Sequence, residues 1–132
     1  KRKLRKMIAY VEKNNLAKPF PLLYAKKDTP EMLYWPVKTF APSYMGETIW
    51  SHWGIEYIKS LIVLSPEEPP LGDLAQHYLT QYKTNIEKTG GYPELYDKKG
   101  TIYKTLIYRS ILHTSWIVNY EQAKMMLTGT AP

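Results

Sequence analysis

The sequence predicts an all-α fold made of antiparallel helical hairpins. Apolar residues recur at intervals of three and four in separate segments, and prolines and glycines fall mainly between those segments. Of the 132 residues, 44% are apolar, which is enough to bury one core. We therefore expect residues 1–132 to form a single helical unit.

The first predicted helix is amphipathic and strongly basic. Leu4, Ile8 and Val11 repeat at helical spacing, and the pattern fades at Asn14. A basic run is usually a solvated helix face, and we interpret this one in that way, with a basic helical nucleic-acid binder as the alternative. The residues that crowd the start of this helix and account for most of the net charge of +6 are Lys1, Arg2, Lys3, Arg5 and Lys6.

Residues 16–46 are predicted to form a long ordered loop. The prolines within it rule out a long helix, and its many aromatic residues are untypical of a disordered linker. Loops of this length in compact domains often carry function.

Two further helices are predicted on either side of a short turn. Residues 47–64 are apolar on nearly every face, which is typical of a buried helix, whereas the spacing over 71–89 indicates a half-exposed one. The sequence SPEEPP at 65–70 separates them. Gly90 supplies the left-handed residue that commonly ends a helix.

A last, buried helix is predicted over 110–127, with Ile111, Trp116, Val118 and Ala123 among its inward residues. The sequence DKKG, which precedes it, is typical of a tight turn.

The alternation of long and short connections predicts how these helices are arranged. The loops at 16–46 and 90–109 should lie at one end of a helical layer, and the turn at 65–70 at the other. Both inner helices would then begin at the loop-rich end. Because helix N-termini carry partial positive charge, that end suits a polar, electron-rich ligand.

The composition excludes several classes of site. The chain has no cysteine, and it contains no nucleophile-elbow, HExxH, Walker, dinucleotide or EF-hand motif. We therefore expect no metal and no cofactor. Its longest apolar run is far shorter than a membrane span and no apolar leader opens it, so we expect no membrane partner and a cytoplasmic location.

Aromatic residues and one carboxylate are predicted to gather at the loop-rich end. Sugar rings stack on tryptophan and tyrosine, while their hydroxyls need fixed polar groups. Glu94 lies between two tyrosines and directly follows Pro93, which restricts the loop, so we expect its carboxylate to be held in place. His52 lies between two tryptophans near a predicted helix start, whereas His77 and His113 are expected to be structural.

Three stretches stand out together: YMGETIWSHWGIEYIKSL, GGYPELYDKKG and LIYRSILHTSWIVNY. In this order they resemble the carboxyl-terminal part of six-hairpin, (α/α) toroid glycosidases, the superfamily of glucoamylases, trehalases, amylo-1,6-glucosidases and neutral invertases. In that group a G-x-T-x-W segment opens one inner helix, a GG-[YF]-P-E-x-[YF]-D loop precedes a later one, and a YRS-like stretch with a tryptophan opens the last. The resemblance extends over residues 1–127.

The resemblance implies the carboxyl-terminal portion of an (α/α)6 toroid that hydrolyses an oligosaccharide or glycoside. Glu94 matches a catalytic carboxylate, usually the general base of an inverting displacement. The general acid would come from the remaining amino-terminal part or a partner chain, so we expect this chain alone to be inactive. Glu47 stands where many relatives have a small or neutral residue, which leaves its role open. The expected substrate-binding residues are Trp35, Trp50, His52, Trp53, Tyr92, Tyr96 and Arg109.

Two alternatives stay open. The first is a noncatalytic carbohydrate-binding or scaffold module, in which the aromatic residues bind and Glu94 only forms hydrogen bonds. The second is the basic nucleic-acid binder, which we do not favour because the basic residues are confined mostly to one helix face.

Overall fold

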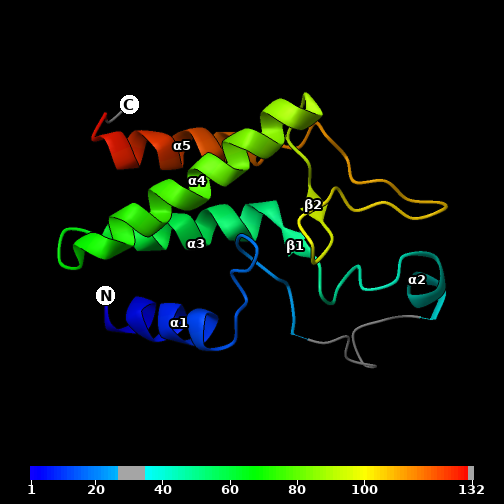
Figure 1. Cartoon of the computed structure of the whole chain (residues 1–132), viewed down its shortest axis with the longest axis horizontal. Coiled ribbons are helices and arrows are strands. Elements are labelled where there is room, and N and C mark those ends of the chain that lie inside the picture. Colours follow the sequence, from blue (N-terminus) through cyan, green and yellow to red (C-terminus); the bar gives the residue numbers. More distant parts are fainter. Residues whose placement is uncertain (27–34, 131–132) are drawn as a thin grey trace.

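The computed structural model describes residues 1–26 and 35–130, and this part of the chain is mostly helical (Figure 1). The prediction of a mainly α-helical unit is therefore confirmed. The part of the predicted loop at 27–34 lies outside the described residues. In chain order the elements are α1 (Arg2–Lys13), α2 (Trp35–Phe40), β1 (Ile49–Trp50), α3 (Ser51–Leu64), α4 (Pro69–Thr89), β2 (Leu95–Tyr96) and α5 (Ile117–Thr128).

Helix α3 is the centre of the fold, and α1, α4 and α5 all pack against it. Its apolar residues point to three neighbours rather than one, which explains why the sequence is apolar on nearly every face. The turn between α3 and α4 reverses the chain, and Pro69 occupies the first helical position of α4, where a missing N–H costs nothing. The predicted antiparallel hairpin is confirmed. The α3 residues with no exposed surface include Ile55, Ile58, Leu61 and Leu64.

Gly54 lets α3 approach its neighbours closely. A Cβ atom at this position would lie 2.2 Å from the Tyr82 hydroxyl oxygen and 2.4 Å from the Pro21 carbonyl oxygen. The Tyr82 hydroxyl donates to the Pro21 carbonyl, so the contact also satisfies two buried polar groups. The loop after α1 is thereby fixed over the start of the α3–α4 hairpin.

The long connections lie at one end of the helices and the short α3–α4 turn at the other, as predicted (Figure 1). The strands β1 and β2 form an antiparallel pair at the loop-rich end, with Trp50 opposite Leu95. Trp50 and Glu94 therefore lie at the same end of the helices. Gly90 ends α4 with a φ of 67°, and Gly100 closes the predicted turn by donating to the Asp97 carbonyl at 2.9 Å.

The prediction of a buried helix over 110–127 is wrong in its first part. Helix α5 begins only at Ile117, because the backbone before it bonds to another segment instead of to itself. The amides of Tyr92 and Glu94 donate to the carbonyls of Leu112 and Ile111. The predicted inward face is also only partly buried: Trp116 and Ala123 are buried, whereas Ile111 is 55% exposed and Val118 is 69% exposed.

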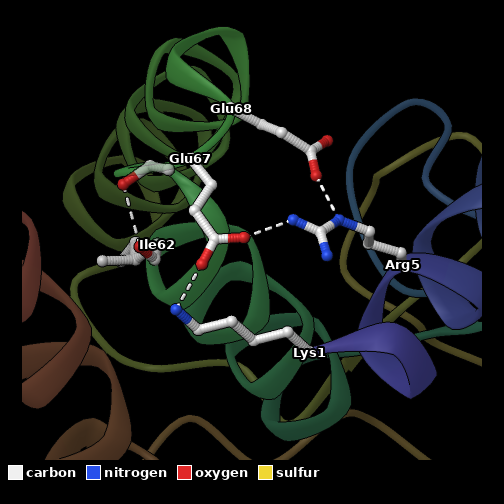
Figure 2. Close-up of polar contacts among 6 residues, drawn as sticks. Lys1, Arg5, Ile62, Glu67 and Glu68 are labelled. Carbon is white, nitrogen blue, oxygen red and sulfur yellow. Dashed lines mark hydrogen bonds and ion pairs between the residues drawn. The ribbon is translucent and has the colours of Figure 1, made fainter.

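The basic start of α1 is partly neutralised by acids of the α3–α4 turn. Lys1 and Arg5 both pair with Glu67, and Arg5 also pairs with Glu68 (Figure 2). These pairs are exposed, so they orient α1 more than they stabilise it. They also leave less of the basic run available to a nucleic acid.

Candidate functional site

The backbone of residues 92–95 is hydrogen-bonded to the start of α3 on one side and to residues 111–116 on the other, which fixes the position of Glu94. Ser51, at the start of α3, donates its amide to the Glu94 carbonyl at 3.0 Å and its hydroxyl to the Pro93 carbonyl at 2.6 Å. From the other side, the Trp116 indole donates to the same Pro93 carbonyl at 3.1 Å. The Glu94 amide in turn donates to the Ile111 carbonyl at 2.8 Å. A side chain on such a segment has little freedom to drift.

The carboxylate of Glu94 is itself held by a phenol. The Tyr108 hydroxyl donates to Glu94 Oε2 at 2.7 Å. Burial, together with the neighbouring Glu94 charge, raises the pKa of Tyr108 well above its ordinary value, so this hydroxyl keeps its proton and stays a donor. The Tyr108 ring packs against Tyr44 and Tyr103, with centroid distances of 5.4 and 5.9 Å. Tyr108 therefore orients one carboxylate oxygen and leaves the other for a ligand.

Glu94 borders an open hollow of about 530 Å³ at the loop-rich end. The hollow lies where the first turn of α3 and the start of α5 meet the segment of residues 92–95. Two helix N-termini therefore point their partial positive charge at this region, as the predicted topology requires. Its lining residues are His52, Glu94, Ile111, His113, Thr114, Ser115, Trp116 and Asn119.

His52, in the first turn of α3, lines the same hollow as Glu94. Its ring lies between Trp50 and Trp53, at centroid distances of 5.7 and 4.7 Å. Burial lowers the pKa of His52, and the charge of Glu94 works against that shift. At neutral pH the imidazole is therefore uncharged, so one nitrogen can donate and the other accept a hydrogen bond.

The structure brings some of the predicted site residues together. Glu94 and His52 line the hollow, and Trp53 is 49% exposed beside His52. Trp50 has a positioning role instead, because its indole N–H donates to the Tyr44 carbonyl and to the Thr48 hydroxyl.

Other predicted site residues lie elsewhere. Tyr96 is only 1% exposed and its ring packs on Phe20 at 5.0 Å, so the prediction that it contacts a substrate is wrong: it belongs to the core. The half-buried Tyr92 packs its ring on Trp116 at 5.5 Å, beneath the hollow. Trp35, in α2, and Arg109, in the loop before α5, are both exposed and are not among the lining residues.

The hollow also has lining residues that the sequence did not predict. His113 was expected to be structural, and Thr114, Ser115 and Asn119 were placed on or near a continuous helix. The non-helical backbone at 110–116 brings His113, Thr114 and Ser115 to the hollow, and Asn119 reaches it from the first turn of α5. The adjacent Thr114 and Ser115 are a signal that was available, because Ser and Thr often directly precede a helix. Tyr108 had no such signal, since its contact with Glu94 depends on the tertiary fold.

The role of Glu47, left open by the sequence, is an ion pair outside the hollow. It precedes β1 and pairs with Lys98 at 3.0 Å, in an exposed position. Within the described residues, no group of three or more His, Asp or Glu side chains is arranged to hold a metal ion. None of the helices in residues 1–26 and 35–130 is long and apolar enough to cross a membrane.

Comparison of the chain with protein families, curated proteins and solved structures gave no match. What the chain does is therefore inferred from its own residues.

Proposed function

We propose that this chain supplies the general base and part of the sugar-binding surface of an inverting glycoside hydrolase. The observation that carries the proposal is the placement of Glu94. Its backbone is hydrogen-bonded on both sides, Tyr108 orients its carboxylate, and it borders an open hollow. A general base needs a fixed carboxylate within reach of a water molecule, and this arrangement provides one.

Hydrolysis with inversion requires two carboxyl groups, roughly 6.5–9.5 Å apart, with the attacking water between the base and the sugar. Glu94 is the single carboxylate among the described residues that line the hollow. The general acid must then come from another part of the enzyme or from a partner chain. In this mechanism Glu94 Oε1 accepts a proton from water, the water oxygen bonds to the anomeric carbon, and the acid protonates the departing oxygen.

The other lining residues suit a sugar. Trp53 offers an exposed aromatic face next to the hollow, and the Ser115 hydroxyl and the Asn119 amide can exchange hydrogen bonds with sugar hydroxyls. The Thr114 hydroxyl donates to the Tyr92 carbonyl at 3.0 Å and can accept a hydrogen bond from a sugar. The neutral imidazole of His52 would add a donor and an acceptor, and the ring of His113 is a further hydrogen-bonding group on the same wall. A hollow with mixed polar and aromatic walls is typical of a site for a polar, ring-shaped ligand.

A noncatalytic carbohydrate-binding module is the second candidate. The observation in its favour is the same single carboxylate, because a lone Glu94 can bind a sugar hydroxyl without any chemistry. Both candidates predict sugar binding at the hollow, and they differ in turnover once a second carboxylate is supplied.

The experiment is NMR titration of the isotopically labelled chain with a panel of neutral oligosaccharides. We expect saturable shifts at His52, His113 and the Trp53 indole, and smaller shifts in Ser115→Ala, which removes one hydroxyl from the exposed rim. Thr84→Ala, an exposed threonine on α4, is the matched control. Saturable shifts confined to α4, or no shifts with any member of the panel, would contradict both candidates.

A further inference from the structure

The loop between β2 and α5 presents two aliphatic side chains to solvent. Leu106 is 104% exposed and Ile107 is 67% exposed, at the tip of the turn formed by residues 105–108. The Thr105 amide donates to the Tyr108 carbonyl at 2.7 Å, and Lys104 and Arg109 face each other in a bridge just below. The tip is thus a hydrogen-bonded turn, and its two apolar side chains point away from the rest of the protein.

The two segments around this tip carry basic but no acidic residues, although Glu94 bonds to Tyr108 at the base of the turn and Glu47 pairs with Lys98. Residues 35–46 and 98–110 contain no Asp or Glu. The Tyr103 hydroxyl donates to the Pro42 carbonyl at 2.6 Å, so the two segments are joined, and in Figure 1 both project from the loop-rich end. Phe40, which is 48% exposed, adds a further apolar side chain. The basic residues of the two segments are Lys38, Lys98, Lys99, Lys104 and Arg109.

From this juxtaposition we propose that the 105–108 tip is a docking surface for an anionic phospholipid membrane, into whose interface Leu106 and Ile107 insert. Moving aliphatic side chains from water to the acyl boundary lowers the free energy, and the negative surface potential of the membrane attracts the flanking basic residues. A nucleic acid would use the positive charge but would leave the aliphatic pair in water. A membrane uses both features.

The basic helix α1 is a weaker place for such a contact. Its apolar residues Ile8 and Val11 are buried in the protein core. Two of its basic residues, Lys1 and Arg5, already pair with acids (Figure 2). The 105–108 tip has its apolar pair exposed, which is why we assign the contact there.

The test uses the absence of cysteine from the chain, because a single introduced thiol gives a unique label. Ile107→Cys and, as a matched control on α4, the exposed Gln76→Cys each carry an environment-sensitive fluorophore. Vesicles of phosphatidylcholine with about 30% phosphatidylserine should shift the emission at position 107 to the blue and leave position 76 unchanged. Neutral vesicles should shift neither, and 0.5 M salt should weaken the anionic effect.

A second variant tests the charges. In the labelled chain, Lys104→Gln with Arg109→Gln should lower partitioning about 25-fold, at about fivefold for each charge removed. Lys3→Gln with Lys6→Gln on α1 should change it much less. Circular dichroism shows whether each variant folds. The proposal is overturned by an unshifted label at position 107, by equal shifts at 107 and 76, by equal binding to neutral vesicles, or by the same shift with heparin alone.

Discussion

At the residue level, Glu94 is the side chain on which the proposed chemistry depends. Replacing it with Gln keeps the shape and most of the hydrogen bonding but removes the ability to accept a proton from water. In the complete enzyme we expect turnover to fall by about 10²- to 10⁴-fold, with little change in substrate affinity. Steady-state kinetics beside a thermal melt would measure this.

Glu47→Gln is the matched control for that experiment, because Glu47 pairs with Lys98 away from the hollow and should leave turnover nearly unchanged. Normal turnover by Glu94→Gln at unchanged stability would remove Glu94 from the mechanism and favour the noncatalytic module.

His52 gives a second prediction at this scale, and the isolated chain is sufficient to test it. Burial lowers its pKa below the ordinary 6.5, and the Glu94 charge counteracts that effect. Glu94→Gln should therefore lower the pKa of His52 further. NMR titration of the imidazole proton resonances measures it, with His77 on α4 as an internal reference. An unchanged or raised pKa in the variant would show that the two side chains do not share the hollow.

The same shift fixes the sign of a pH effect on stability. Because the folded pKa of His52 lies below the unfolded one, the unfolded chain binds the proton first as pH falls. The contribution of His52 to stability is thus present above about pH 6.5 and is lost as the pH falls through the folded pKa. Chemical denaturation at several pH values should show a smaller pH dependence for His52→Gln than for the unchanged chain.

At the element level, the packing of α3 against α4 and the loop after α1 depends on Gly54. We expect Gly54→Ala to destabilise the fold by about 1–3 kcal/mol or more, because the added Cβ would overlap the Tyr82 hydroxyl and the Pro21 carbonyl. Urea denaturation measures the change. Gly72→Ala is the control, since its nearest atom lies 3.3 Å away on Ser65 and it should cost much less. A Gly54→Ala chain as stable as the original would mean that this close approach is absent in solution.

An element could be predicted from the sequence when its backbone hydrogen bonds stay within the element. Helices α3 and α4 bond within themselves, so spacing, prolines and Gly90 were sufficient to predict them. The stretch at 110–116 has a similar apolar pattern, but its carbonyls accept from Tyr92 and Glu94. No local pattern reveals a partner that far away in the chain. The same pairing brought His113 and Thr114 to the site, and it explains why they were missed while Glu94 and His52 were predicted.

At the level of the whole molecule, α3 and α5 pack side by side and each leaves a valine exposed. Val63 on α3 is 43% exposed and Val118 on α5 is 69% exposed. Lys59, one turn before Val63, bonds to Gln122, one turn after Val118, at 2.7 Å, so the two valines flank this polar contact on one surface. Under the proposed function this surface is where further helices of the enzyme would pack.

Because this surface is uncovered, we expect the isolated chain to self-associate and to hydrolyse no glycoside. Sedimentation velocity over a range of protein concentrations should show mass increasing with concentration. Val63→Glu with Val118→Glu should shift the chain toward the monomer, since each buried contact would now have to desolvate a charge. The control is Thr80→Glu with Thr84→Glu, at two exposed positions of α4. It changes the net charge equally and should leave association unchanged. A chain that stays monomeric at high concentration would instead indicate a self-sufficient small domain, and glycoside hydrolysis by that monomer would show that no external general acid is needed.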